Sequence, residues 1–246
     1  MTADVRLTVD VEDWYDGMAV LGERIDRPVE QASGLVGLTS LLRDREATVT
    51  LFVVGNYAPA VRSELAHLVS RGHEIASHGP DHGRLPDDPA RLVDWLRRGR
   101  EMLEELVQVP VRGFRSPRFD VPESIGLARF RELLAKAGFD YVSDTHRLSN
   151  GSPVAELPVF TRGRFPVGGG SYQRLLPTSA VTSMVDAAAG PVVLYYHSYD
   201  FGATLPPTAS IRSLATAKQL IGRNRIATVF SSILTRYGSR ALSHAG

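Results

Sequence analysis

The sequence contains no cysteine, which excludes a disulfide framework, thiolate metal ligands and a cysteine nucleophile. It also has no stretch of roughly 18 consecutive apolar residues, the minimum for a transmembrane helix. The first residues show no basic segment followed by an apolar one, so they do not resemble a secretory signal. We therefore expect no integral membrane segment, and a cytoplasmic protein is the simplest interpretation.

An excess of charge of either sign is missing too. The chain has 28 Lys and Arg against 27 Asp and Glu, for a net charge of +1. No overall field therefore favours nucleic acid or an anionic membrane surface as a partner. With 246 residues, of which 43% are hydrophobic and 22% charged, the composition is that of an ordinary globular protein. We expect a single domain over residues 1–246, and the sequence does not indicate its oligomeric state.

Apolar, β-branched runs alternate with stretches of helical periodicity. The spacing predicts strands at 5–11, 47–55, 73–77, 111–114, 139–143 and 191–197, and helices at 30–46, 58–71, 89–108 and 123–137. This alternation is typical of βα units around a parallel sheet that is closed, or nearly closed, as a barrel. In such folds the chemistry lies at the carboxyl ends of the strands. Residues 145–178 are rich in Pro and Gly and predict an inserted loop or cap.

Two predicted strand ends carry the residue types of a metal site. Asp10, Glu12 and Asp13 follow the first strand, and His78 and His82 follow the third, with three residues between them. Buried carboxylates repel one another unless a cation lies between them. Two histidines with one carboxylate form an open site of the kind found in catalytic zinc and some iron proteins. The alternative is that the histidines are ordinary residues of a surface loop.

Two further strand ends carry single functional candidates. Arg115 follows a short strand and could hold a carboxylate of a neighbouring strand end, or it could be an exposed loop residue. His197 ends the last strand, where it fits a general acid, a metal ligand or a satisfied histidine at the rim of the core. His73 and Glu74 do not form a zincin motif, because position 77 is serine. We expect His73 to be structural.

Together these motifs resemble, in type and order, those of the polysaccharide deacetylases, the NodB homology family or carbohydrate esterase family 4. The matching features are T-x-D ending in Asp10, the H-x-x-x-H of His78 and His82, R-x-P from Arg115 to Pro117, and His197. The resemblance spans about residues 5–235. The segments DVEDW and HSYD are most similar to those of intracellular deacetylases associated with exopolysaccharide export. The resemblance implies a distorted (β/α)7-type barrel.

The resemblance also implies catalytic roles. Asp10 would be the base, His197 the acid that protonates the leaving amine, and Arg115 the residue that keeps Asp10 ionised. A divalent metal would bind His78, His82 and one carboxylate, with Zn²⁺ the leading candidate and Co, Ni or Fe the alternatives. In the family the second aspartate of the first motif binds the metal, but here that position is Val11. We favour Asp13, because the chain leaves the strand there, with Glu12 as the alternative.

The implied reaction is hydrolysis of N-acetyl groups on a saccharide that contains amino sugars. The candidate substrate-binding residues are Trp14, Pro117, Asp144, Gly169 and Tyr172. Asp144 is also a candidate for tuning His197. Alternatively, Trp14 packs at the strand end and Tyr172 lies in a flexible loop, and neither residue binds substrate.

Other functions fit the same residues. One is an amidohydrolase of the same fold that acts on a small cyclic amide such as allantoin, or on a formamide. Another is a non-catalytic carbohydrate-binding protein, and a weaker one is an iron(II) oxygenase. An open groove would favour a polymeric substrate, whereas a closed pocket would favour a small amide.

Overall fold

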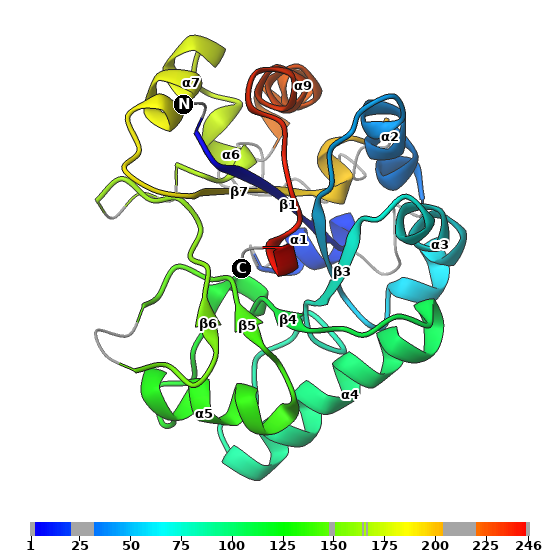
Figure 1. The fold of residues 1–246 in the computed structure, drawn as a ribbon. Coiled ribbons are helices and arrows are strands. Elements are labelled where there is room, and N and C mark those ends of the chain that lie inside the picture. Colours follow the sequence, from blue (N-terminus) through cyan, green and yellow to red (C-terminus); the bar gives the residue numbers. More distant parts are fainter. Residues whose placement is uncertain are drawn as a thin grey trace.

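The computed structural model describes residues 3–20, 32–147, 151–163, 165, 167–203 and 220–244. Within these residues a seven-stranded parallel sheet has the strand order β6-β5-β4-β3-β2-β1-β7. The strands are β1 (Val5–Val11), β2 (Thr50–Val53), β3 (Glu74–Ser77), β4 (Gly113–Phe114), β5 (Tyr141–Val142), β6 (Ala155–Glu156) and β7 (Val192–His197). The sheet curls into the distorted barrel that the sequence predicted (Figure 1).

Helices surround the curled sheet (Figure 1). The α-helices are α1 (Trp14–Val20), α2 (Ser33–Leu42), α3 (Arg62–Ser70), α4 (Pro89–Val107), α5 (Leu127–Ala137), α6 (Gly170–Gln173), α7 (Thr178–Asp186) and α9 (Ile226–Tyr237). The 3-10 turns are η1 (Ala58–Val61), η2 (Pro117–Phe119), η3 (Ser198–Asp200), η5 (Arg223–Arg225) and η6 (Leu242–His244). None of the helices within the described ranges is long and apolar enough to cross a membrane.

Helix α4 shows how the local sequence sets these elements. Pro89 occupies its first turn, and the Asp88 carboxylate accepts a hydrogen bond of 2.9 Å from the backbone N–H of Arg91. Both features are signals for a helix start. The helix ends where Gln108 adopts a left-handed conformation with φ of 56°. Its apolar stripe packs on the sheet through five buried residues, Leu92, Val93, Leu96, Gly99 and Leu103.

The two faces of strand β1 have different surroundings. Leu7, Val9 and Val11 belong to the large apolar core between sheet and helices. Because side chains alternate along a strand, Thr8 and Asp10 face the barrel interior. Strand β1 therefore carries polar residues inward toward the end where the chain leaves the sheet.

The C-terminal segment closes the amino end of the barrel (Figure 1). The Ser239 hydroxyl accepts a hydrogen bond of 2.9 Å from the backbone N–H of Leu7. The backbone N–H of Leu242 donates to the Thr50 hydroxyl at 2.8 Å. The Leu242 side chain joins an interior apolar cluster that includes Phe52 and Tyr195. The interior is thus packed below the site, and only its carboxyl end is left for chemistry.

Residues 145–178 were expected to be an inserted loop or cap, but they contribute to the barrel itself. They supply the edge strand β6 and helix α6. Val159 and Gly169 form parallel bridges to Val193 and Tyr195 of β7. This part of the chain therefore fills the gap between the two edges of the sheet.

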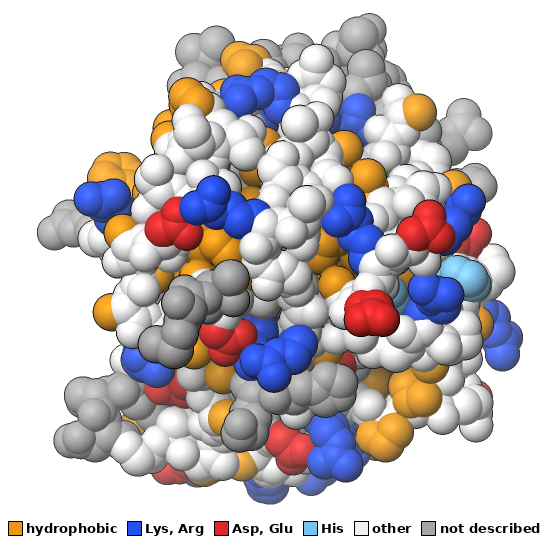
Figure 2. Space-filling view, turned by 45° about the horizontal axis from the view of Figure 1, so that its top comes forward, with side chains coloured by type: hydrophobic (Ala, Val, Ile, Leu, Met, Phe, Trp, Pro, Cys, Tyr) orange, Lys and Arg blue, Asp and Glu red, His pale blue; other side chains and the backbone are white. Residues whose placement is uncertain are grey.

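The surface carries both signs of charge. In Figure 2, Lys and Arg side chains alternate with Asp and Glu side chains, and no large area of one sign covers this face. This pattern agrees with the net charge of +1, and nothing on this face indicates a nucleic-acid partner.

Candidate active site

The register of the parallel strands brings four polar strand ends together. Asp10 on β1 lies beside His197 on β7. Val53 on β2 pairs with Ser77 on β3, and Ser77 pairs with Phe114 on β4. The carboxyl ends of parallel strands meet at one edge of a sheet. The residues that follow these strand ends therefore converge: Glu12, His78, His82 and Arg115.

Glu12, His78 and His82 form a compact set of donor atoms. One ligand atom from each lies within 4.8 Å of the other two. Glu12 Oε2 is 2.7 Å from His82 Nε2 and 4.0 Å from His78 Nε2. Glu12 Oε2 is buried between these two imidazole nitrogens. Two imidazoles and one carboxylate with open positions fit a catalytic divalent metal such as zinc.

The surroundings of His78 keep its imidazole neutral, as a metal ligand requires. Its Nδ1 lies 2.9 Å from the backbone carbonyl oxygen of Arg115, to which it donates in the neutral form, and this leaves the Nε2 lone pair toward Glu12. Burial, with a further contribution from the neighbouring His82, lowers the pKa of His78 to about 3. The ring is therefore neutral at physiological pH, as a metal ligand must be.

Without a cation, Glu12 and His82 form a buried ion pair. Burial opposes charge on His82, but the adjacent Glu12 carboxylate outweighs it and raises the pKa of His82 to about 9. Burial also raises the pKa of Glu12, but the charges of His82, His197 and His78 more than offset this, so its pKa is lowered. A metal ion that binds here must therefore displace a proton from His82.

The structure places Glu12, and not the favoured Asp13, beside the two histidines. No bulge interrupts the alternation after Val11, so Glu12 stays on the inward face that Asp10 occupies. Asp13 instead begins helix α1, where its carboxylate accepts a hydrogen bond of 2.8 Å from the backbone N–H of Tyr15. The Asp16 carboxylate in turn accepts a hydrogen bond of 3.3 Å from the backbone N–H of Asp13. Asp13 is therefore the N-cap residue of helix α1.

The predicted contact between Arg115 and a neighbouring carboxylate is confirmed. Arg115 Nη1 donates to Asp10 Oδ1 at 2.7 Å and to the Thr8 hydroxyl at 2.9 Å. Its other nitrogens donate to the backbone carbonyl and the hydroxyl of Ser143, at 3.0 and 2.8 Å. The guanidinium lies over the Phe52 ring, 4.1 Å from its centroid. Arg115 is fully buried, so it fixes the orientation of the Asp10 carboxylate.

His197 lies on the opposite side of Glu12 from the other two histidines. Its Nε2 is 3.8 Å from Glu12 Oε1, and its Nδ1 is 3.6 Å from Asp200 Oδ2. The side chain is 19% exposed, so a substrate can reach it. Burial lowers the pKa of His197, but Asp200 and Glu12 outweigh this and the net pKa is raised. A charged imidazole at this place is suited to donate a proton.

Two predicted substrate contacts, Trp14 and Asp144, are placed elsewhere. Trp14 is 1% exposed and stacks on Tyr199 with ring centroids 4.2 Å apart, so it has no free face for a sugar. Asp144 is also buried, and both of its oxygens face Arg131, with the shorter contact at 2.9 Å. A buried guanidinium takes a carboxylate partner from nearby. This pairing holds Asp144 to Arg131 rather than to His197.

The remaining substrate candidates have mixed placements. Pro117 is buried at the start of η2. Gly169 lies under the ring of Tyr195, where a side chain would not fit. Tyr172 is 38% exposed and borders an apolar hollow with Phe165 and Leu175.

Sequence reasoning assigned no role to three residues around His197. Tyr199 stacks on the imidazole with centroids 4.9 Å apart and ring planes at 4°. Tyr195 meets the same ring edge-on at 6.0 Å. Asp200 completes the group. The segment HSYD held part of this signal, because a carboxylate three residues after a histidine at a helical turn can reach back to it.

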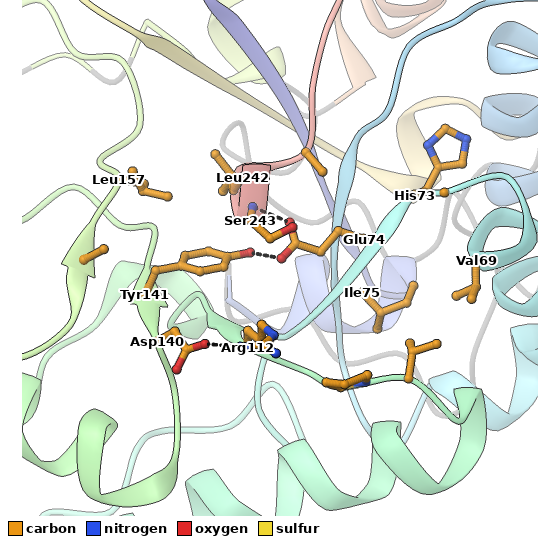
Figure 3. Close-up of a pocket in the computed structure, with 15 residues that line it drawn as sticks. Val69, His73, Glu74, Ile75, Arg112, Asp140, Tyr141, Leu157, Leu242 and Ser243 are labelled. Atoms are coloured by element: carbon orange, nitrogen blue, oxygen red, sulfur yellow. Dashed lines mark hydrogen bonds and ion pairs between the residues drawn. The ribbon is translucent and has the colours of Figure 1, made fainter. Parts of the chain in front are cut away.

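A cavity at the opposite end of the barrel has a different character. Its volume is about 600 Å³, and it lies at the amino ends of β3, β4 and β5 (Figure 3). Glu74 accepts hydrogen bonds there from the Tyr141 hydroxyl at 2.9 Å and the Ser243 backbone N–H at 3.1 Å. Arg112 and Asp140 pair with each other at 2.9 Å. Because these groups satisfy one another at the amino face, we assign this cavity to stability and not to chemistry.

Two parts of the chain match known protein families. Residues 31–142 match the polysaccharide deacetylase family, and residues 129–244 match a domain of unknown function, DUF3473. The first of these matches makes the chain similar to the polysaccharide deacetylases over residues 31–142. No curated protein matches the chain significantly.

Solved structures share its fold. A candidate polysaccharide deacetylase from Mycobacterium smegmatis superposes with a TM-score of 0.67 at 22% identity, covering 99% of this chain and 88% of that one. A family 4 carbohydrate esterase from Streptomyces lividans, in complex with acetate, gives 0.52 at 17% identity, with 94% and 88% covered. A family 4 pseudoenzyme from Bacillus anthracis gives 0.56 at 12% identity, with 98% and 64% covered. The fold therefore occurs with and without activity, so the site must decide the function.

Proposed function

We propose that this protein is a metal-dependent deacetylase that removes N-acetyl groups from a saccharide containing amino sugars. The observation that carries the proposal is the convergence of one donor set with two groups placed to transfer protons. The donor set is Glu12, His78 and His82. Asp10 and His197 lie side by side on adjacent strands next to it. A protein that only binds sugar needs neither a metal-donor set nor proton-transferring residues beside it.

A divalent metal held by this donor set would supply Lewis acidity, which activates water and polarises the amide carbonyl. The residues of the chain do the rest. Asp10, oriented by Arg115, accepts the proton of the attacking water. His197 gives a proton to the leaving nitrogen as the C–N bond breaks. The products are acetate and a free amine.

Zn²⁺ is the metal that best fits the donor set, and Co, Ni or Fe also suit two imidazoles and a carboxylate. Metal binding requires neutral imidazoles. His78 is neutral already, whereas His82 must give up its proton.

An open, polar groove supports a saccharide over a small cyclic amide. It has a volume of about 590 Å³ and is formed by residues that follow His82 and Pro117, among them Arg84, Arg118 and Asp120. Arg118 and Phe119 both have left-handed backbone conformations, with φ of 60° and 58°. Such strain costs about 1–3 kcal/mol for each residue and is often found at ligand sites. Because the groove is open, it suits a chain of sugars better than a small cyclic amide.

The test is hydrolysis of a panel of amides: chitooligosaccharides and UDP-N-acetylglucosamine, followed by amine release, and allantoin as the cyclic amide, followed by ring opening. Metal-free protein, zinc-loaded protein and zinc-loaded Asp10→Asn protein are compared. We expect zinc-dependent release from a sugar that Asp10→Asn lowers by about 100-fold or more. Turnover of allantoin alone would assign the site to a small amide. A chain that binds zinc but turns over none of the panel would contradict the proposal.

A further inference from the structure

The proposed general acid needs a partner for its second ring nitrogen. His197 presents Nε2 toward Glu12 and the substrate side. Its Nδ1 must be held as well, because an unheld imidazole can rotate or present the wrong tautomer. Asp144 was the expected partner, but it is paired with the buried Arg131. The position is therefore filled from another part of the chain.

Asp200 lies where such a partner is required. Its Oδ2 accepts a hydrogen bond of 3.2 Å from the backbone N–H of His197, and the same atom lies 3.6 Å from His197 Nδ1. Asp200 also faces the imidazole through its backbone N–H, and among the described residues Asp200 Oδ1 is a buried atom with no hydrogen-bond partner. Hydrogen bonds of catalytic groups are often this long before substrate binds.

The plane of the His197 ring is fixed separately. Tyr199 stacks on the imidazole with ring centroids 4.9 Å apart and nearly parallel planes. Trp14 in turn stacks on Tyr199 with centroids 4.2 Å apart. Trp14 and Tyr199 are both buried. Stacking on Tyr199 therefore limits rotation of the imidazole about its Cβ–Cγ bond, and the carboxylate of Asp200 lies on its Nδ1 side.

Arg174 supports Asp200 from behind. The Arg174 side chain is 3% exposed, and its Nη1 lies 3.8 Å from Asp200 Oδ1. Its own carbonyl oxygen accepts a hydrogen bond of 2.9 Å from Arg225. Gly170 packs beside this pair, where a Cβ would lie 2.9 Å from the Tyr196 ring. Arg174, His197 and Asp200 all lie in residues 129–244, the part that matches the domain of unknown function.

We propose that Asp200, backed by Arg174, is the positioning residue of the His197 imidazole, so that residues 129–244 supply and orient the general acid of the barrel. This inference rests on the proposed function. In the step concerned, the C–N bond breaks, its electron pair goes to nitrogen, and nitrogen takes the proton from His197 Nε2. The Nδ1 proton stays on the ring, directed at Asp200 Oδ2 throughout.

The test compares two leaving groups in Asp200→Asn protein. One probe is the N-acetylated compound that the protein turns over fastest in the panel above, whose leaving amine requires a proton. The other is 4-nitrophenyl acetate, whose leaving phenolate does not. Asparagine keeps an oxygen for the backbone N–H of His197 and removes the charge. We expect kcat on the amide to fall about 100-fold with KM unchanged, and ester hydrolysis to change less than about twofold.

Two controls separate positioning from folding. Asp186→Asn removes an exposed carboxylate that pairs with Arg236 at 2.7 Å, and both activities should stay unchanged. In a His197→Ala background, Asp200→Asn should lower amide turnover no further, because the group it positions is gone.

The outcomes are distinct. Amide and ester rates that fall together, or an amide rate that does not fall, overturn this inference alone. Unmodified, zinc-loaded protein that releases no amine overturns the proposed function, and this inference with it.

Discussion

The Arg115 guanidinium donates a hydrogen bond of 2.7 Å to Asp10 Oδ1 in the barrel interior, where neither side chain has significant exposure. The two residues are 105 positions apart in the sequence. Phe52 covers one face of the guanidinium, and Ser143 binds its far edge. The Asp10 carboxylate is therefore oriented by a fixed, planar partner and not by solvent.

This geometry predicts that Arg115→Lys impairs catalysis more than folding. A lysine cannot bind Asp10, Thr8 and Ser143 at once, because it lacks the planar fork of arginine. We expect kcat to fall about 10- to 100-fold with a smaller change in KM. Steady-state kinetics on the best amide substrate measures this. Arg112→Lys, in an exposed pair with Asp140, is the matched control. Equal kinetics for the two variants would contradict the assigned role of Arg115.

The placement of Glu12 predicts different effects at adjacent carboxylates. Glu12→Gln should weaken zinc binding by at least about 10-fold, because the carboxylate of the donor set is lost. Asp13→Asn should leave zinc affinity within about twofold, because Asp13 caps helix α1. Competition with a chromogenic chelator gives both affinities. A larger loss in Asp13→Asn than in Glu12→Gln would restore the original expectation from the sequence.

The buried position of His73 predicts that the protein loses stability in mild acid. Its Nδ1 accepts a hydrogen bond of 3.2 Å from the backbone N–H of Val49, which requires the neutral ring. Burial, with help from Arg71 and His67, lowers the pKa of His73 to about 4, whereas an unfolded histidine has a pKa near 6.5. Between these values the unfolded chain binds the extra proton, so the free energy of unfolding falls as pH decreases from about 6.5 to about 4.

The measurement is urea unfolding of the protein and of His73→Asn at pH 7.5 and pH 5. The unmodified protein should lose more stability between the two pH values than the variant, because other titrating groups cancel in the comparison. An equal loss in both proteins would show that His73 is not responsible.

The buried ion pairs of Arg131 predict that its substitution lowers stability strongly, although it lies away from the candidate active site. It is fully buried on α5 and holds Asp144 at 2.9 Å and Glu156 of the edge strand β6 at 2.8 Å. Arg131→Met leaves both carboxylates without their cation and should lower the free energy of unfolding by about 3–5 kcal/mol. Arg112→Met, at an exposed ion pair, should lower it by less than about 1 kcal/mol. Denaturant titration compares them, and similar losses would contradict the buried-pair account.

The sequence predicted the alternating core of the barrel well, because long apolar strands and capped helices are local signals. The expected strand 5–11 and helix 89–108 agree with β1 and α4 to within a residue. Strand β6 was missed because two residues are too few for a pattern. Helices α7 and α9 were also not anticipated, although α9 has a buried face formed by residues such as Val229 and Ile233.

The site shows the same division between local and long-range information. Asp10, His78, His82, Arg115 and His197 could be placed from strand ends, because parallel strands share one active edge. The choice of Glu12 over Asp13 depended on whether the strand bulges, a difference of one residue that sequence does not resolve. The partner of His197 depended on where Arg131 is buried, because that charge takes Asp144. Such competition between buried charges is settled only in three dimensions.

The most direct test of the central claim is a titration of metal-free protein with Zn²⁺, with amine release from the best N-acetylated sugar as the readout. We predict no activity without metal, a linear rise that breaks at one Zn²⁺ per chain, and a flat response in Glu12→Gln at the same concentrations. Undiminished amine release by the metal-free protein, or a Glu12→Gln variant that responds as the unmodified chain does, would contradict it.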